Sequence, residues 1–292
     1  MTGWTIGIMG GSGLYALDAL ENSVWVDVDT PWGPPSDQLL TGSIGTVNFV
    51  FLPRHGRGHI IGPSQLNYRA NIDAMKQLGV TDLVSISAVG SLAEELPPGT
   101  FVMVDQFIDR TFAREKSFFG DGVVAHVSVA DPVCPRLAGF VSAAARAAGA
   151  PVHDGGTYLA MEGPQFSSRA ESLLYRQWGA HVIGMTAMPE AKLAREAELP
   201  YALVGMVTDY DCWREDEAPV DVAAVIERLH GNAALARALV ENLARSLPEG
   251  RTASPIDSVL DYAIITAAHA RDPALVAKLS HVAGRVLECD DI

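Results

Sequence analysis

Two carboxylates follow a long apolar stretch of the sequence. Residues 201–208 read YALVGMVT, and Asp209 and Asp211 come directly after them. Alternation along an extended chain places both acids on one side, where mutual repulsion and partial burial raise the pKa of one of them. A carboxyl that keeps its proton near neutral pH can donate it to a departing group, which makes both acids candidate catalytic residues. The alternative is that they cap a helix or face solvent.

A glycine loop near the start of the chain is a second candidate. Residues 6–15 read IGIMGGSGLY, an apolar strand pattern that ends in Gly10, Gly11 and Gly13 around Ser12. Glycines lack a Cβ and let backbone N–H groups turn toward an anion, and the Ser12 hydroxyl adds a donor. The loop therefore indicates either a phosphate site or a tight turn without a ligand.

The same loop also fits a dinucleotide pattern, because Gly11, Gly13 and Ala16 have the spacing G-x-G-x-x-A. That pattern needs a helix at once and an acidic residue about 20 residues further on. Residues 15–37 are too short for a full crossover helix, and Asp27 lies in an alternating, hairpin-like stretch. An NAD-binding oxidoreductase or sensor is therefore the alternative from a different functional class.

Basic and hydroxyl residues close three other apolar runs. Arg54 and His55 follow one run in FLPRHGRGH, where a cation and a donor would suit an oxyanion, although a solvated basic turn is the alternative. Ligands of α/β folds gather at the carboxyl ends of strands, so several such endings indicate one site. Small residues at these ends could instead only permit close packing. The other two endings are Ser87 with Ala88 in VSISAVGSL, and Met185 with Thr186 in VIGMTAMPE.

Strand-like runs alternate with helical patterns along the first 250 residues. The runs are 47–52, 82–88, 101–104, 157–161, 181–185 and 201–208. The helical patterns run from Ser64 to Gly79 and over 135–148, 168–178 and 189–196. This alternation predicts an α/β fold with a mixed, largely parallel twisted sheet flanked by helices.

The chain is expected to form one domain over 1–250, because no linker or low-complexity segment interrupts it. A break at 247–255 precedes helical patterns at 256–270 and 273–287. Residues 251–292 are therefore predicted to be a helical C-terminal extension that packs on the domain or on a neighbouring subunit.

The composition limits the classes of partner. The chain has 292 residues, 48% hydrophobic and 19% charged, and 21 basic against 35 acidic side chains give a net charge of -14. This balance argues against binding nucleic acid or an anionic membrane. The three cysteines are far apart and lack C-x-x-C spacing, which suggests neither a disulfide framework nor a zinc knuckle. No apolar run approaches the ~20 residues of a membrane span and no signal peptide is recognisable, so a cytoplasmic location is expected.

Taken together, the motifs resemble a known family. They are, in order, GGSG, RHG, NYRAN, AVGSL, DQFIDRT, EGPQFSSRAES, MTAMPEA and TDYDCW. Their order and spacing resemble the trimeric purine nucleoside phosphorylase superfamily and, within it, the S-methyl-5'-thioadenosine phosphorylases, over about residues 6–242. The resemblance implies a phosphorylase-type α/β fold, a homotrimer, inorganic phosphate as co-substrate, and no metal or organic cofactor.

The resemblance also implies roles for individual residues. The phosphate would be bound by Ser12, Arg54, His55, Ser87, Ala88 and Thr186. The nucleoside would be contacted by Met185 at the ribose, Phe166 and Ser167 in the base or sugar pocket, and Asp209, Tyr210 and Asp211 near the adenine edge. An apolar slot for the 5'-methylthio group would be formed by Val222 and Val225, completed by His126 and a C-terminal residue of the adjoining subunit.

The implied reaction is phosphorolysis of S-methyl-5'-thioadenosine to adenine and 5-methylthioribose 1-phosphate, a step of methionine and purine salvage. Glycosidic cleavage builds positive charge on the ribose and negative charge on the purine, so phosphate should stand on one side and a proton donor such as Asp209 on the other. The 6-oxopurine relatives carry Glu after the GPxF phenylalanine and Asn at the position of Asp209. Ser167 and Asp209 therefore favour a 6-aminopurine, with a 6-oxopurine nucleoside or methylthioinosine phosphorylase as the alternative.

Overall fold

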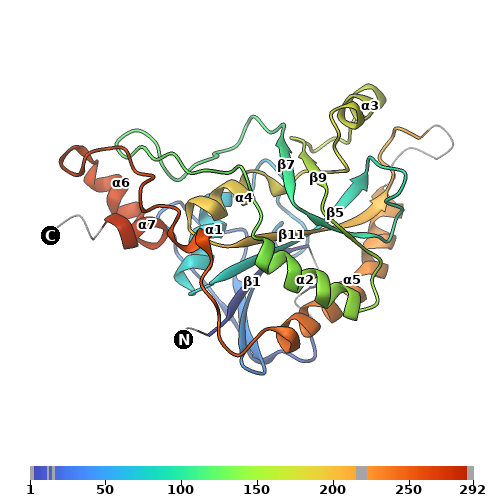
Figure 1. Cartoon of the computed structure of the whole chain (residues 1–292), viewed down its shortest axis with the longest axis horizontal. Coiled ribbons are helices and arrows are strands. Elements are labelled where there is room, and N and C mark those ends of the chain that lie inside the picture. The colour runs from blue at the N-terminus through green and yellow to red at the C-terminus, as the bar shows by residue number, and fades with distance from the viewer. Residues whose placement is uncertain (1–2, 12, 15–16, 215–221, 288–292) are drawn as a thin grey trace.

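The computed structural model describes residues 3–11, 13–14, 17–214 and 222–287, with the backbone alone for 222–227, 229 and 230. One twisted sheet forms the middle of the molecule, and helices cover both of its faces (Figure 1). The three layers are held together by apolar side chains on each side of the sheet. This arrangement brings the ends of several strands into one region.

The centre of the sheet consists of four parallel strands. They are β4 (Val47–Pro53), β1 (Thr5–Gly10), β5 (Asp82–Ser91) and β11 (Tyr201–Asp209), paired in that order. Their residues are nearly all buried, as expected of strands with helices on both sides. The remaining strands are β2 (Glu21–Val26), β3 (Leu39–Ile44), β6 (Phe101–Val104), β7 (Gln106–Asp109), β8 (Val152–Asp154), β9 (Thr157–Ala160) and β10 (Val182–Gly184).

Strand β5 is the branch point of the sheet. It pairs in parallel with β1 and β11, and its last residues also pair antiparallel with β10. Ser87 of β5 lies opposite Gly205, and Gly90 lies opposite Asp209 after a register shift between Val207 and Asp209. A bulge of this kind re-aims the side chain that follows it. The last residues of β5 therefore lie between β10 and the carboxyl end of β11.

Each face of the sheet has its own helices and its own core. One face carries α1 (Tyr68–Gln77), α4 (Ala187–Glu196), α6 (Pro273–Lys278) and α7 (Ser280–Leu287), and the other carries α2 (Pro135–Ala147) and α5 (Val222–Ser246). Ile72 and Met75 on α1 are fully buried on the first face, and Val141 on α2 with Leu239 on α5 on the second. The helix α3 (Arg169–Gln177) packs through Tyr175 in a third cluster with β9 and β10.

The predicted α/β fold is confirmed: the sheet is mixed, parallel pairings predominate, and helices flank it. One helix start was wrong, because α1 begins after Asn67 rather than at Ser64. The Asn67 side chain accepts a hydrogen bond from the Ala70 N–H at 3.1 Å, whereas the Ser64 hydroxyl is bonded to Glu162. The helix α5 was not predicted.

The helix expected over 256–270 was also wrong. Short 3-10 helices occur at Pro255–Ser258 and Ala268–Ala270, and between them turns over 259–263 lead into an extended segment that begins at Ile264. There the Ile265 N–H donates to the Val124 carbonyl at 2.9 Å, and the His126 N–H donates to the Ala263 carbonyl at 2.9 Å. The β-branched residues of this segment favour the extended form.

The second half of the extension packs on the rest of its own chain. Leu279, Val282 and Leu287 are buried in the core that α1 and α4 share. Arg285 on α7 also forms an ion pair with Glu198, just beyond the end of α4, at 2.6 Å. The boundary at residue 250 stays a prediction.

Candidate active site

Asp209 ends strand β11 in a confined position. Its Oδ2 accepts a hydrogen bond from the Thr208 hydroxyl at 2.7 Å, and its Oδ1 accepts one from the Asp211 N–H at 2.8 Å. Opposite it, Gly90 has no side chain, and a Cβ there would lie 3.0 Å from Oδ1. The bonds and the neighbouring glycine together fix where this carboxyl can stand.

The pKa of both acids departs upward from the ordinary value. Burial raises the pKa of Asp209, although the Thr208 hydroxyl and the Asp211 N–H act in the opposite direction. Burial also raises the pKa of Asp211, and the nearby charge of Asp209 raises it further. Asp211 has a left-handed backbone with φ of +53°, which is uncommon outside glycine. A carboxyl with a raised pKa is suited to hold and release a proton.

Two hydroxyls meet where β5 and α4 come together. The Ser87 and Thr186 hydroxyl oxygens are 3.4 Å apart, and both residues are buried. Thr186 directly precedes α4, whose first turn is interrupted by the non-helical backbone of Met188. Ala88 follows Ser87 on β5, and its carbonyl accepts a hydrogen bond from the Ser87 hydroxyl at 3.1 Å. The hydroxyl pair (Ser87 and Thr186) is therefore suited to bind an oxyanion.

Arg54 directly follows β4 and is buried, with an exposed fraction of 2%. Its guanidinium pairs with the Glu190 carboxylate at 2.8 Å and donates to the Ser85 hydroxyl at 2.6 Å. It also donates to the carbonyls of Met9, near the end of β1, at 3.0 Å and of Ile86, in the middle of β5, at 3.3 Å. The Arg54 guanidinium thus lies against β5, with its charge paired to Glu190 and most of its N–H groups bonded inside the protein.

His55 is held as a neutral imidazole. Its Nδ1 lies 2.8 Å from the Ile61 carbonyl, which can only accept, so Nδ1 carries the proton and Nε2 has a free lone pair. Burial and then the charge of Arg54 lower the pKa of His55 to about 4. The ring stacks on His59 at 4.2 Å. In this state Nε2 can accept a hydrogen bond from a protonated phosphate oxygen.

The residues expected at the nucleoside lie around the same strand ends. The Ser167 carbonyl accepts from the Cys212 thiol at 3.2 Å, which places the segment of Ser167 and Phe166 beside Asp211. Phe166 is 45% exposed. Met185 approaches Gly163 so closely that a Cβ on this glycine would lie 2.5 Å from its sulfur.

Other expected residues lie further out or outside the description. The Tyr210 hydroxyl donates to the Glu94 carbonyl at 3.4 Å, and its ring lies under the Arg214 guanidinium. His126 is exposed and paired through its backbone with Ala263. Ser12 lies outside the described residues. Val222 and Val225 lie on α5, and their side chains are outside the description.

The proposed anion side and the carboxyl side are separated by a short length of one strand. Ser87 and Gly90 are three residues apart on β5, and Gly90 faces Asp209. At a rise of about 3.3 Å per residue, this corresponds to roughly 10 Å. That length accommodates a sugar between an oxyanion and a heterocyclic base.

Several residues that support this region escaped the sequence reasoning. They are Arg114, Glu190, Tyr158 and Thr208. Glu190 is 1% exposed, and the sequence does not distinguish it from Lys192, Arg195 and Glu196 on the same helix. The partners of such buried charges come from distant segments, which a local pattern does not reveal.

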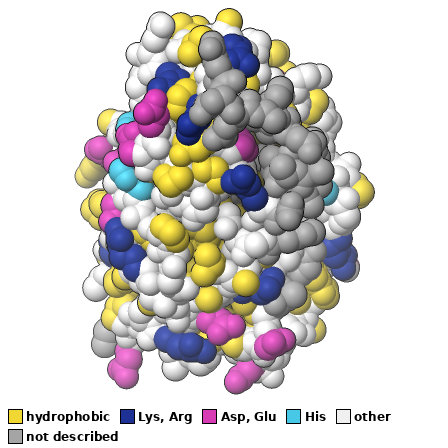
Figure 2. All heavy atoms as spheres, turned by 90° about the vertical axis from the view of Figure 1, so that its right-hand side faces the viewer, with side chains coloured by type: hydrophobic (Ala, Val, Ile, Leu, Met, Phe, Trp, Pro, Cys, Tyr) yellow, Lys and Arg dark blue, Asp and Glu magenta, His cyan; other side chains and the backbone are white. Residues whose placement is uncertain are grey.

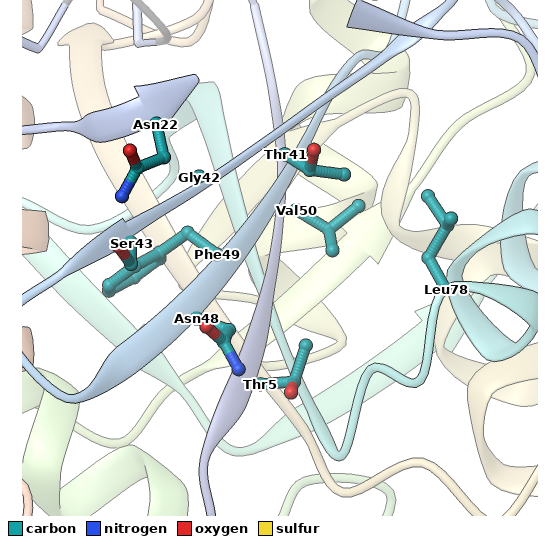
Figure 3. A pocket seen from close by; sticks show the side chains of 9 residues that line it. All are labelled: Thr5, Asn22, Thr41, Gly42, Ser43, Asn48, Phe49, Val50 and Leu78. Carbon is teal, nitrogen blue, oxygen red and sulfur yellow. The ribbon is translucent and has the colours of Figure 1, made fainter. Parts of the chain in front are cut away.

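Two hollows lie away from this region. One, of about 390 Å³, is lined by β1 to β4 and the end of α1, with polar side chains that include Asn22, Thr41 and Asn48 (Figure 3). Another, of about 660 Å³, lies between α2 and the β6 and β8 strands. Neither includes a predicted site residue. In the described part of the chain, no three His, Cys, Asp or Glu side chains are placed to hold a metal.

No helix within the described ranges combines the length and the apolarity needed to cross a membrane.

Comparisons with known proteins point in one direction. A relative from Cereibacter sphaeroides named S-methyl-5'-thioadenosine phosphorylase is 61% identical over 97% of this chain and 98% of its own. A solved methylthioadenosine phosphorylase from an antarctic soil metagenomic library superposes with a TM-score of 0.91 at 44% identity, covering 97% and 99% of the two chains. A Schistosoma mansoni methylthioadenosine phosphorylase in complex with adenine superposes with a TM-score of 0.78 at 38% identity, covering 82% and 91%.

The family model described as Phosphorylase superfamily matches residues 5–245, which include every strand of the sheet and the strand ends described above. The chain is therefore a member of the phosphorylase superfamily.

Proposed function

We propose that this chain catalyses phosphorolysis of S-methyl-5'-thioadenosine, which yields adenine and 5-methylthioribose 1-phosphate. As a pentosyltransferase, it would serve methionine and purine salvage. The relatives named for this activity reach 61% identity over nearly the full chain. The single observation that carries the proposal within the structure is the position of Asp209, a partly buried carboxyl that faces Gly90 at the far end of the strand that bears Ser87.

In the proposed mechanism, phosphate binds at the hydroxyl pair, with the charge of Arg54 beneath it and His55 Nε2 as an acceptor for a phosphate proton. As the glycosidic bond lengthens, positive charge grows on the ribose, and the phosphate oxygens stabilise it. Negative charge grows on the purine at the same time. Protonated Asp209 shares its proton with N7 and so neutralises the leaving group, and phosphate then bonds to the anomeric carbon.

The preference for a 6-aminopurine rests on the same carboxyl. An Asp209 oxygen can accept a hydrogen bond from a 6-amino group, and a 6-oxo group in its place would leave two acceptors facing each other. A pocket that pairs one exocyclic group rejects the other by several orders of magnitude. The Ser167 carbonyl contacts Cys212, which places Ser167 beside Asp211. Its side chain is a hydroxyl, so it lacks the carboxylate that the 6-oxopurine relatives carry at this position. Selection of the methylthio group by Val222, Val225 and His126 belongs to the proposal.

The proposal includes a homotrimer without metal or organic cofactor, located in the cytoplasm. Large apolar side chains are exposed on the single chain, among them Ile60, Phe112, Phe166, Trp178 and Tyr262. Figure 2 shows one face, on which hydrophobic side chains are interspersed with Lys, Arg, Asp and Glu. Large apolar side chains exposed on a single chain are typical of surfaces that other subunits cover, which supports the proposed homotrimer. Light scattering coupled to gel filtration measures the mass, and a monomeric mass would contradict the trimer.

The decisive experiment is incubation of the purified protein with S-methyl-5'-thioadenosine, with and without inorganic phosphate. We expect adenine to be released only with phosphate, and its absence by chromatography would refute the proposal.

Methylthioinosine and inosine in parallel reactions distinguish the 6-oxopurine alternative, because faster cleavage of either would favour it. A titration with NAD tests the dinucleotide alternative, for which we expect no binding.

A further inference from the structure

Arg114 occupies a buried position between the segments of the proposed active site. Its side chain is 1% exposed although the neighbouring residues Phe112 and Glu115 are exposed. A buried guanidinium is costly unless nearly all of its N–H groups are bonded. Arg114 meets this requirement mainly with backbone carbonyls rather than with a paired acid.

The first group of contacts is with the segment that connects β10 and α4. The Arg114 Nη1 donates to the Met185 carbonyl at 2.5 Å and to the Met188 carbonyl at 2.6 Å. Met188 has a non-helical backbone within α4, so its carbonyl is not committed to the regular helical pattern. Arg114 therefore supplies the donor that this irregular turn needs.

The bond to Met185 also orients the peptide group that leads to Thr186. The carbonyl of that peptide points to Arg114, and its N–H, carried by Thr186, faces the buried Tyr158 hydroxyl at 3.4 Å. A peptide group is planar, so contacts at both ends fix its rotation. This rotation determines where the Thr186 hydroxyl stands relative to Ser87.

The second group of contacts is with the segment that leads to Phe166 and Ser167. Arg114 Nη2 donates to the Glu162 carbonyl at 2.7 Å, and Nε lies 3.5 Å from the Glu162 carboxylate. That carboxylate in turn accepts from the Phe112 N–H at 2.6 Å. Directly after it comes Gly163, which contacts the Met185 side chain.

We infer that Arg114 is a positioning residue: one guanidinium sets the relative placement of the Met185–Thr186 turn and of the segment from Glu162 to Ser167. It touches neither phosphate nor nucleoside in this assignment. The inference rests on the proposed function, because it concerns how the two binding segments act together. A lysine at this place keeps the charge but has one donor group on a flexible stem and cannot reach the same carbonyls in one plane.

The test compares Arg114→Lys with Arg195→Lys. Arg195 is also buried and also donates to backbone carbonyls, those of Ser128 and Asp131, but it lies outside the proposed site. We expect R114K to lower kcat/KM for S-methyl-5'-thioadenosine about 100-fold, with higher KM for both nucleoside and phosphate. Its melting temperature should stay close to that of R195K. Activity of R114K within about threefold of R195K would overturn the inference.

Chemical rescue of kcat/KM is a measurement that distinguishes a positioning role of Arg114 from a purely structural one. In Arg114→Ala, added methylguanidinium should restore at least about a tenth of the lost kcat/KM, and the same concentration of urea should not. No rescue by methylguanidinium, or equal rescue by urea, would overturn the inference. A wild-type protein that releases no adenine would instead refute the proposed function, so the two failures are distinguishable.

Discussion

Gly90 and Asp209 face each other across β5 and β11 so closely that a single methyl group on the glycine would touch the carboxyl. The Cβ would lie 3.0 Å from Asp209 Oδ1 and 3.4 Å from the Asp211 Cβ. We expect Gly90→Ala to displace Asp209 and to lower kcat at least tenfold. Steady-state kinetics with S-methyl-5'-thioadenosine and phosphate measures the change.

Gly205→Ala is the matched control on the same pair of strands. A Cβ at Gly205 would meet the Val89 methyl groups at 3.1 and 3.3 Å and the Val102 carbonyl oxygen at 3.8 Å, none of which belongs to a carboxyl. Both variants should lose about 1–3 kcal/mol of unfolding free energy from overpacking. If G205A reduces kcat as much as G90A does, the effect comes from general strain and our explanation is wrong.

Asp209→Asn tests the proton donor and the base preference together. Asparagine keeps the shape and accepts through one atom, but it carries no acidic proton. We expect kcat for S-methyl-5'-thioadenosine to fall by about 10²–10⁴. The ratio of kcat/KM for inosine-type substrates to that for adenine-type substrates should rise, since the amide N–H₂ can donate to a 6-oxo group. An unchanged ratio would remove Asp209 from base recognition.

The ion pair of Arg54 and Glu190 predicts strong non-additivity in stability. Glu190→Gln leaves the Arg54 charge buried without its counter-charge, which we expect to cost about 3–5 kcal/mol of unfolding free energy. Combining it with Arg54→Met should cost clearly less than the sum of the two single changes. Urea unfolding measures the cycle. The exposed pair of Arg245 and Glu241 is the control, and Glu241→Gln should cost no more than about 0.5 kcal/mol.

Glu196 predicts a pH dependence of stability. Burial raises the pKa of this carboxyl to about 7, against the opposing bonds from the Phe118 N–H at 2.7 Å and the Ser117 hydroxyl at 2.8 Å. Because the folded pKa lies above the unfolded value, the contribution to stability is complete below about pH 4.5 and is lost as the pH rises through 7.

The comparison with Glu196→Gln isolates this contribution, because the other titrating groups are common to both proteins. The unfolding free energy of the wild type relative to E196Q should decrease by about 1–3 kcal/mol between pH 5 and pH 8. Denaturant titrations at both pH values provide the measurement. A constant difference would mean that Glu196 is not titrating in this range.

The sequence predicted the strands β1, β4, β5, β6, β9, β10 and β11, because each is an apolar run with a clear end, but β3, β7 and β8 were not predicted. Runs 201–208 and 101–104 correspond to β11 and β6 within one residue. The extended segment near Ile264 was missed because its pairing partner, Ala125, lies far away in the sequence. The start of α1 was missed because Ser64 and Asn67 are both good N-cap residues, and the contact of Ser64 with Glu162 decides between them.

The candidate site was predictable only in part for a related reason. Residues at strand ends, such as Ser87 and Asp209, are recognisable from the run that precedes them. Arg114 and Glu190 are single charges whose role depends on partners from other segments, which include Met185 and Glu162 for Arg114 and Arg54 and Tyr201 for Glu190. Their importance is a property of the three-dimensional packing, and a local pattern carries no trace of it.

Because Ser87 and Gly90 belong to one strand that is hydrogen-bonded on both sides, the sheet itself sets the distance between the proposed phosphate position and the proposed purine position. Surrounding loops can change in length or composition without altering that distance. Homologous enzymes could therefore accept substrates with other 5'-substituents or bases when their loops are replaced. The distance from the phosphate to the anomeric carbon would stay the same. In the proposed mechanism, the β5 backbone therefore determines how far the base of any substrate lies from the phosphate.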